Sequence, residues 1–296
     1  MSSASTSTPI RRAPRASGNR APLLLLLPST VLLVLLLGWP LLVGIGQAFG
    51  LPGEFTVAHW TRMVGDPRFG DAVRNTLLVT VVLIPIQFVL AAAMALLLWA
   101  RLRLSGVYFY LWAVPLAVSD LAAGLVWLSI FTNNGYLNSL LGAFGVEPVE
   151  WLSFHSPATM FLAVLLAELW RSTSLVMVIL VAGLQGIPRD VDEAAQVFGA
   201  SFGQRLRHVI LPLLKPSIQV AVILRTILAF EAFAAAQALT GRNFPMLVGE
   251  TYEWYAVLSE PAVASAVGLV VLGISMVTAV VYLRLLRQPA AFWSTR

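Results

Sequence analysis

Long stretches without a charged residue constrain this chain more than any other feature of its sequence. No Asp, Glu, Lys or Arg occurs between Arg20 and Glu54, and further apolar stretches follow along the 296 residues. A helix that crosses about 30 Å of hydrocarbon needs about 20 mostly apolar residues. Charged residues make up 11% of the chain, against roughly a quarter in an ordinary globular domain. The composition therefore excludes a soluble enzyme, a disordered regulator and a DNA-reading domain.

The apolar stretches predict an all-α, polytopic membrane protein with six transmembrane helices. Each predicted span covers enough residues to cross the bilayer. The first is interpreted as a retained anchor, because it is longer than the apolar part of a secretory signal and shows no clear cleavage site. The predicted spans cover about residues 23–49, 73–100, 105–131, 158–186, 214–240 and 262–286.

The distribution of Lys and Arg predicts the orientation of these spans. Thirteen of the nineteen lie on the side of the N-terminus, four lie on the other side, and Arg171 and Arg225 fall within the membrane. Basic residues favour the cytoplasmic side, so both termini are predicted to be cytoplasmic. We expect a flexible tail over 1–22, one membrane domain over 23–287 and a second cytoplasmic tail over 288–296. Nucleic acid is not an expected partner, because the basic residues are not gathered on one domain face.

Several chemistries lack the residues that they require. The chain has no cysteine, and its three histidines are too far apart to form a ligand pair, so no metal site is expected. It contains no G-x-x-x-x-G-K-[ST] motif, so it has no phosphate-binding loop of its own. The pattern G-x-S-x-G occurs at 199–203, but the preceding strand and a histidine on a later span are absent. We therefore expect neither enzymatic activity nor a cofactor bound by this chain.

The segment 187–212, between the fourth and fifth spans, is the most informative stretch. Asp190 with Glu193 three residues later resembles a capping box at a helix start. Apolar residues follow at helical spacing on one side, and Gly199 allows a turn before the fifth span. These features predict a short amphipathic helix outside the bilayer, which could lie on lipid or fit a groove of a partner protein. The apolar side consists of Val191, Ala194, Ala195, Phe198 and Phe202.

The same segment resembles the EAA motif of permease subunits of bacterial binding-protein-dependent ABC importers. Glu193-Ala194-Ala195 precedes Gly199, and Ile210-Leu211-Pro212 follows. Other motifs are similar to the sugar branch, with the larger permeases of maltose-type and glycerol-3-phosphate-type systems. They include Asn75-Thr76, Trp170-Arg171, Gly183-Leu-Gln-Gly-Ile-Pro188 and Leu239-Thr-Gly241.

This resemblance implies the fold, the partners and the residues that couple transport to ATP. The fold would be that of a type I ABC importer permease, located in a bacterial inner membrane. The partners would be a second permease subunit in a heterodimer, a dimer of ATP-binding subunits that hydrolyse ATP, and an extracytoplasmic solute-binding protein. The solute would be a sugar or a similar polar molecule. The coupling helix, which contacts the ATPase, would present Glu193, Ala194, Ala195, Phe198 and Gly199. Phe198 departs from the family, which often has Asp before this glycine.

Ionisable residues inside the predicted spans are functional candidates, since each costs at least about 2.5 kcal/mol unless it is paired or hydrated. Asp120 and Glu231 each lie about 22 Å from the cytoplasmic end of their spans, so they could meet at one depth. Carboxylates beside aromatic rings suit a polyhydroxylated solute. Solvation of both carboxylates in a central cavity, without solute contact, is an equally good interpretation. The candidate substrate path consists of Asp120, Trp127, Phe230, Glu231 and Phe233.

A second pair of charges is predicted near the midplane. Glu168 lies about 15 Å from the outer end of its span and Arg225 about 14 Å from the inner end of its own. A structural ion pair between them is the preferred interpretation. Arg171 is a competing partner for Glu168, because it follows three residues later on the same helix.

A secondary transporter or channel for a polar solute is the alternative function. Intramembrane charges and the prolines Pro85 and Pro115 would suit such a protein too. Inverted repeats would favour it, and none is apparent in the sequence. The EAA-type loop favours the importer permease.

Overall fold

The computed structural model describes residues 21–100 and 103–285, and within them it contains helices and no strand. This agrees with the predicted all-α membrane fold. Five helices are individually long and apolar enough to cross a membrane, and a bent pair of helices would complete six. Residues 1–20 and 286–296, and with them most of the two predicted tails, lie outside the described residues.

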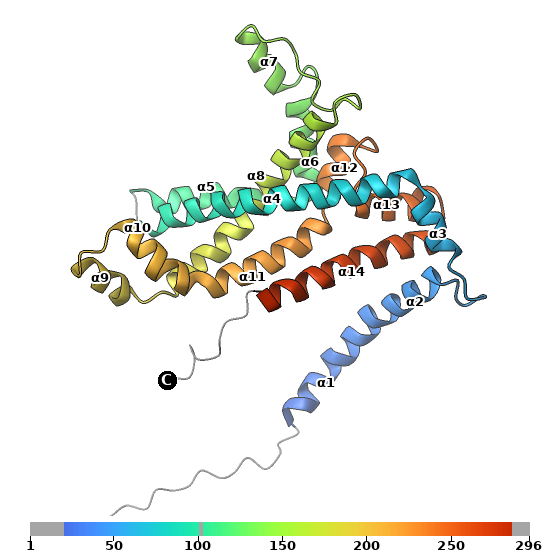
Figure 1. The fold of residues 1–296 in the computed structure, drawn as a ribbon, viewed down its shortest axis with the longest axis horizontal. Helices are drawn as coiled ribbons and strands as arrows, with labels where there is room; N and C mark the ends of the chain where they lie inside the picture. The colour runs from blue at the N-terminus through green and yellow to red at the C-terminus, as the bar shows by residue number, and fades with distance from the viewer. Residues whose placement is uncertain (1–20, 101–102, 286–296) are drawn as a thin grey trace, which may run out of the picture.

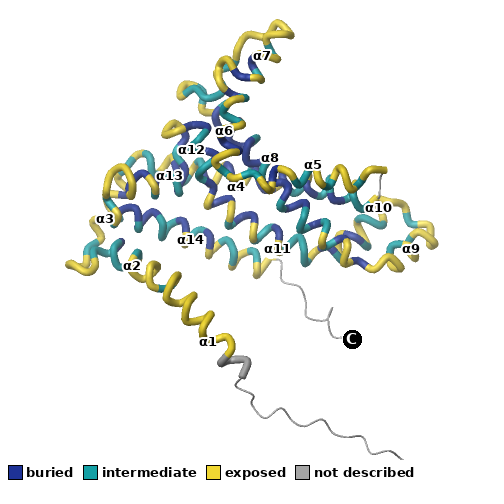
Figure 2. The backbone as a smooth tube through the Cα atoms, turned by 180° about the vertical axis from the view of Figure 1, so that it is seen from behind, coloured by how far each residue is buried: buried dark blue, intermediate teal, exposed yellow. Residues whose placement is uncertain are grey.

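The first span diverges from the rest of the bundle. It is formed by α1 (Ala21–Leu33), a π-helical turn (Val34–Gly38) and α2 (Trp39–Ala48). Of these, α2 packs against α14, and α1 diverges from the bundle (Figure 1). Exposed side chains run almost without interruption from Leu25 to Leu42 (Figure 2). Such a surface requires lipid or a partner helix around it.

The bundle is built around α4 (Pro67–Trp99) and α8 (Pro157–Gln185). Asp66 accepts a hydrogen bond from the backbone N–H of Arg68 and so caps the N-terminus of α4. α11 (Leu211–Phe230) packs against both, and α14 (Pro261–Leu285) packs against α11. The helices α4, α11 and α14 run side by side along the long axis, and α8 crosses them (Figure 1).

The third span departs from the prediction, which placed one helix over 105–131. It consists of α5 (Ser105–Ala117) and α6 (Asp120–Phe131), and the chain bends by 101° between them. Val118 and Ser119 are extended, and Ser119 caps α6 by accepting a hydrogen bond from the backbone N–H of Ala122. A strong helix start inside an apolar stretch therefore divides the span.

The fifth span also differs from its prediction over 214–240. A continuous helical path runs through α10 (Phe202–Arg205), a π-helical turn (Leu206–Ile210) and α11, and it ends at Phe230. A separate helix, α12 (Ala234–Thr240), follows. α6 packs against α12, so the C-terminal parts of the third and fifth predicted spans meet each other.

Shorter helices complete the end of the molecule opposite α9 and α10 (Figure 1). They are α3 (Ala58–Gly65), α13 (Leu247–Tyr252) and a π-helical turn (Glu253–Val257), whereas α7 (Tyr136–Ala143) follows α6 and projects away from the bundle. Three side chains fix this end to α4. Asn75 Nδ2 donates to the carbonyl of Pro245 at 3.0 Å, Thr76 Oγ1 accepts from the backbone N–H of Leu247 at 3.0 Å, and Arg68 donates to the carbonyl of Arg242 at 2.6 Å. The segment between α12 and α13 is therefore held in place by α4.

The contact between α6 and α12 depends on a glycine. A Cβ atom on Gly124 would lie 2.6 Å from the Cβ of Ala238 and 2.9 Å from the Cα of Ala235. These atoms belong to rigid parts of α12, so they cannot give way without moving the helix.

Replacement of Gly124 by alanine should therefore destabilise the fold. Overpacking of this kind costs about 1–3 kcal/mol. Thermal unfolding of the purified protein, followed by size-exclusion chromatography after heating, should show a lower Tm. The control is Gly273→Ala in α14, where an added Cβ meets no atom within 4 Å. An equal Tm for both variants would contradict the close approach of α6 and α12.

Candidate functional site

The segment between α8 and α11 contains a short helix, and the turn that follows this helix fixes its direction. α9 (Arg189–Val197) ends at Gly199, whose φ is +77°, a conformation that favours glycine. The backbone N–H of Gly199 donates to the carbonyl of Gln196, and that of Ala200 donates to the carbonyl of Ala195. This is the hydrogen-bond pattern of a Schellman motif. The predicted turn at Gly199 is therefore present.

The predicted helix start differs in its chemistry. Pro188 occupies the N-cap position of α9 without a side-chain cap, so Asp190 and Glu193 form no capping box. Asp190 lies inside the first turn, where its carboxylate can only favour the helix dipole. The capping box of this segment is formed at α10, where Ser201 and Gln204 exchange side-chain and backbone hydrogen bonds.

An ion pair holds α9 against the segment that leads into α11. Arg205 Nη1 lies 2.9 Å from Asp192 Oδ2, and Gln196 Nε2 donates to the same oxygen at 2.9 Å. Both charged side chains are largely buried, with exposed fractions of 17% and 14%. Asp192 therefore faces the protein and fixes which side of α9 points outward.

The outward side of α9 and its turn carries exposed apolar groups. The exposed fraction is 85% for Val197 and 89% for Phe198, and Glu193 and Ala194 are exposed beside them. Ala195 is half-buried. Large apolar side chains held outward by a rigid turn form a surface suited to a partner protein.

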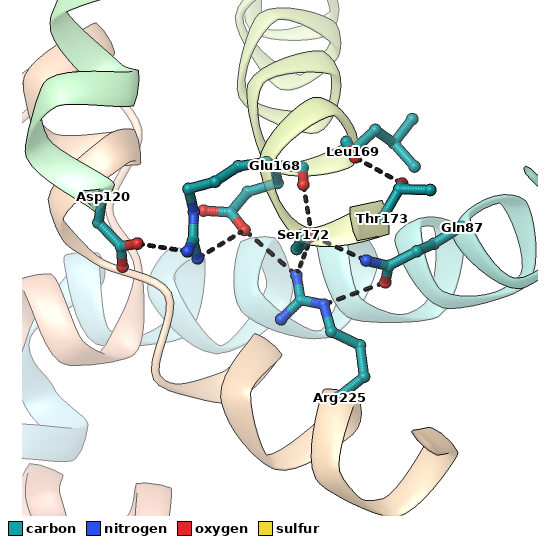
Figure 3. Close-up of polar contacts among 8 residues, drawn as sticks. Gln87, Asp120, Glu168, Leu169, Ser172, Thr173 and Arg225 are labelled. Carbon is teal, nitrogen blue, oxygen red and sulfur yellow. Dashed lines mark hydrogen bonds and ion pairs between the residues drawn. The ribbon is translucent and has the colours of Figure 1, made fainter. Parts of the chain in front are cut away.

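A buried polar cluster joins α4, α8 and α11 (Figure 3). Arg225 and Glu168 are each 1% exposed, and Nη2 of Arg225 lies 3.2 Å from Oε2 of Glu168. The same nitrogen donates to Oγ of Ser172 at 2.9 Å, and Nε of Arg225 donates to Oε1 of Gln87 at 3.0 Å. Gln87 Nε2 donates in turn to Ser172 Oγ at 2.9 Å. Each member has at least two partners, as a buried charge requires.

Arg171 extends this cluster to the break in the third span. Its Nη1 lies 2.6 Å from Oδ1 of Asp120, and its Nη2 lies 3.9 Å from Oε2 of Glu168. Glu168 therefore contacts both arginines, the one predicted as its partner and the competing one. Asp120 begins α6, and 42% of its side chain is exposed, so the outer member of the cluster is open to solvent.

The five substrate-path candidates lie on α6, on α11 and in the segment between α11 and α12. Trp127 on α6 stacks on Phe131 and meets Trp170 edge-on. Phe230 is buried, Glu231 is exposed at the end of α11, and Phe233 packs on Tyr252. Asp120 at the start of α6 is paired with Arg171. The meeting of Asp120 and Glu231 at one depth stays a prediction, although the spans that carry them are interrupted and not continuous helices.

Sequence reasoning missed Gln87 and Ser172, which complete the shell of Arg225. Each is a single uncharged polar residue on a long apolar helix, which is common where helices contact each other. Gln87 is the more informative of the two, because it is fully buried two residues after Pro85 on α4. A buried amide in an apolar span signals a polar partner on another helix.

Removal of the Arg225 guanidinium should destabilise the assembly of α4, α8 and α11. In Arg225→Leu, Glu168 keeps a buried carboxylate with only the 3.9 Å contact to Arg171, and broken buried pairs cost about 3–5 kcal/mol. The Tm and the yield of purified protein should both fall. Combining the change with Glu168→Leu should recover part of the loss. Arg74→Leu, at an exposed arginine of α4, is the matched control. Unchanged Tm and yield in Arg225→Leu would reject a structural role for the pair.

Comparison with known proteins identifies the family. Residues 87–288 match the model of the binding-protein-dependent transport system inner membrane component. The chain is 34% identical over 285 residues to the sulfoquinovosyl glycerol transport system permease protein of Agrobacterium fabrum, with 89% of each chain covered. It is 31% identical over 244 residues to the trehalose transport system permease protein of Mycobacterium tuberculosis H37Rv, with 78% of this chain and 76% of that protein covered.

Solved structures support the same fold. A bacterial ABC transporter involved in the import of the acidic polysaccharide alginate contains a chain that matches with a TM-score of 0.76 at 18% identity, covering 91% of this chain and 96% of that one. At this identity the likeness concerns the fold alone. Together with the family match and the apolar helices, it establishes a multi-pass membrane protein. The chain belongs to the family of inner membrane components of binding-protein-dependent transport systems, the permease subunits of ABC importers.

Proposed function

We propose that this chain forms half of the translocation pathway of an ABC importer for a sugar or a similar polar solute. The observation that carries the coupling role is the outward apolar surface of α9 and its turn, held by Gly199 and by the Asp192–Arg205 pair. The proposed ATPase contact comprises Glu193, Ala194, Ala195, Phe198 and Gly199. The solute class is supported by relatives whose names state sulfoquinovosyl glycerol, trehalose and trehalose/maltose transport.

The proposed assembly contains a second permease subunit, a dimer of ATP-binding subunits and an extracytoplasmic solute-binding protein. ATP would be used by the ATP-binding subunits, and this chain would bind no cofactor or metal. The exposed first span supports the heterodimer, because its apolar side chains from Leu25 to Leu42 offer a contact surface for another membrane subunit.

For the solute path, the exposed carboxylate of Asp120 and the rings of Trp127 and Phe233 remain the proposed contacts. Asp120 is supported because its side chain is partly exposed while it pairs with Arg171, so it can exchange that partner for hydroxyl groups. The buried Glu168–Arg225 pair would serve the stability of the bundle. Phe230 and Glu231 would lie beside the path where α11 ends.

The coupling role predicts that the turn after α9 is needed to retain the ATP-binding subunit. Proline cannot adopt the positive φ of Gly199, and it lacks the N–H that bonds to Gln196. In Gly199→Pro, the ATP-binding subunit that co-purifies with the tagged chain should fall by about tenfold or more. The second permease should stay bound.

The control for this experiment is Gly203→Ala in α10. An added Cβ there meets no atom within 4 Å, so the variant should retain the ATP-binding subunit at the native level. Native-level retention in Gly199→Pro would reject the coupling role.

The proposed orientation places α9, α10 and both termini in the cytoplasm. Because the chain has no cysteine, single introduced cysteines report the side of the membrane without a background signal. A membrane-impermeant maleimide added to spheroplasts should label Glu147→Cys, after α7, and should label Arg207→Cys only after permeabilisation. Both positions are exposed. The reverse labelling pattern would overturn the orientation.

A further inference from the structure

A pocket lies beside the start of α9, between the ends of three other helices. Its volume is about 430 Å³, within the roughly 300–1,000 Å³ typical of small-molecule sites. The end of α4, the start of α5 and the end of α8 supply its walls. Apolar and aromatic side chains predominate, among them Leu98, Phe109, Tyr110 and Leu184.

A smaller, polar pocket of about 160 Å³ adjoins the first one. The two share Trp99 and Arg189, and the smaller one adds Asp192, Glu193 and Gln196. The combined site therefore has an apolar part along the spans and a charged part along α9.

The charged part offers one cation and one free carboxylate. Asp192 is paired with Arg205 and Gln196. In the part of the chain that the structure describes, no ion pair involves Arg189 or Glu193, and both are exposed. A ligand that joins a phosphate to a primary ammonium matches this arrangement, with the phosphate on Arg189 and the ammonium on Glu193.

The apolar part lies at the depth of lipid rather than in the aqueous loop. Ala95 lines it one turn inside Trp99, about 6 Å along α4. Trp99 and Tyr110 mark the level of the interface, where such aromatic residues gather. A ligand that fills both parts must therefore carry an acyl chain.

We propose that this site binds one membrane phospholipid with a zwitterionic phosphoethanolamine head group. One acyl chain lies between Leu98, Phe109 and Leu184, the phosphate contacts Arg189, and the ammonium donates to Glu193. Val197 and Phe198 lie at the other end of α9, about 12 Å from Arg189, so the phosphate contact stays clear of the apolar part of the proposed ATPase contact. Glu193 belongs to both contacts, so the lipid and the ATP-binding subunit share this carboxylate.

The site has a consequence for regulation. Leu184 at the end of α8, Ile187 in the connection and Arg189 at the start of α9 all line the pocket. A bound lipid therefore holds α9 relative to α8, and the aminophospholipid content of the membrane sets the fraction of transporters in which this connection is held.

The experiment is lipid titration of the delipidated, fully assembled transporter, followed by native mass spectrometry. The lipids are phosphatidylethanolamine, phosphatidylcholine and phosphatidylglycerol with the same acyl chains. One molecule of phosphatidylethanolamine should bind to this chain, and its affinity should be the highest of the three lipids. Phosphatidylcholine should bind more weakly, because its quaternary ammonium cannot donate a hydrogen bond, and phosphatidylglycerol should bind more weakly because Glu193 repels it.

Two variants test the position of the lipid. Gly106→Leu fills the pocket, since a Cβ at Gly106 meets no atom within 4 Å, and Gly106→Ala is its control. Arg189→Gln removes the phosphate contact, and Arg207→Gln, at an exposed arginine of the same segment, is its control. Each test variant should weaken phosphatidylethanolamine binding roughly tenfold, and the controls should match the native protein. The surface change Arg189→Gln keeps the test decisive if Gly106→Leu does not assemble.

Three outcomes would overturn the proposal. Equal phosphatidylethanolamine binding in the native protein and in Arg189→Gln would remove the head-group site. Stronger binding of phosphatidylglycerol than of phosphatidylethanolamine would show that the site prefers an anionic head group to a zwitterionic one. A photo-crosslinker at Ser105 that captures the ATP-binding subunit instead of lipid would show that a protein covers the pocket.

Discussion

The desolvated guanidinium of Arg225 is the interaction on which the rest of the bundle depends. A charge at this depth is costly unless it is fully paired, and its partners come from two other helices, Gln87 on α4 with Glu168 and Ser172 on α8. Their geometry fixes the relative rotation and depth of α4, α8 and α11, because a shift of any one helix would leave a buried polar group without a partner. Apolar packing alone would permit several such arrangements in lipid.

The same helices connect the polar cluster to both ends of the molecule. α8 continues from Ser172 to Gln185 over about 20 Å, and there the chain turns into α9. On the other side, Arg171 reaches Asp120 at the first turn of α6, and α6 packs on α12. A displacement of α9 by a docked ATPase would therefore act on helices that also hold the break in the third span. This continuity is the physical basis of the proposed coupling.

Much of the fold could be predicted from charge and hydropathy alone. The first, second, fourth and sixth predicted spans each correspond to a long helical path, because in lipid the length of an apolar run fixes the length of a helix. The second helix begins at Pro67, before the predicted span. The breaks at Ser119 and after Phe230 were not predicted, since a capping serine in an apolar stretch is a weak signal beside 27 spanning residues.

Counting residues along each span to estimate depth brought Glu168 near Arg225, because α8 and the inner part of α11 are continuous helices. For Asp120 and Glu231 the same counting assumed continuous helices, whereas the third span is broken at Ser119 and α11 ends at Phe230. Pro188 occupies the N-cap of α9 where a capping box was expected, and the capping box of this segment belongs to α10, at Ser201 and Gln204.

The central claim, that this chain moves a solute only as part of an ATP-driven assembly, is tested most directly by uptake into proteoliposomes of defined composition. The account predicts accumulation of the solute only when both permeases, the ATP-binding subunits, the binding protein and ATP are present on their proper sides. Omission of the ATP-binding subunits should abolish uptake even under an imposed proton or sodium gradient. Gradient-driven uptake by this chain without ATP-binding subunits would contradict the account and would identify a secondary transporter.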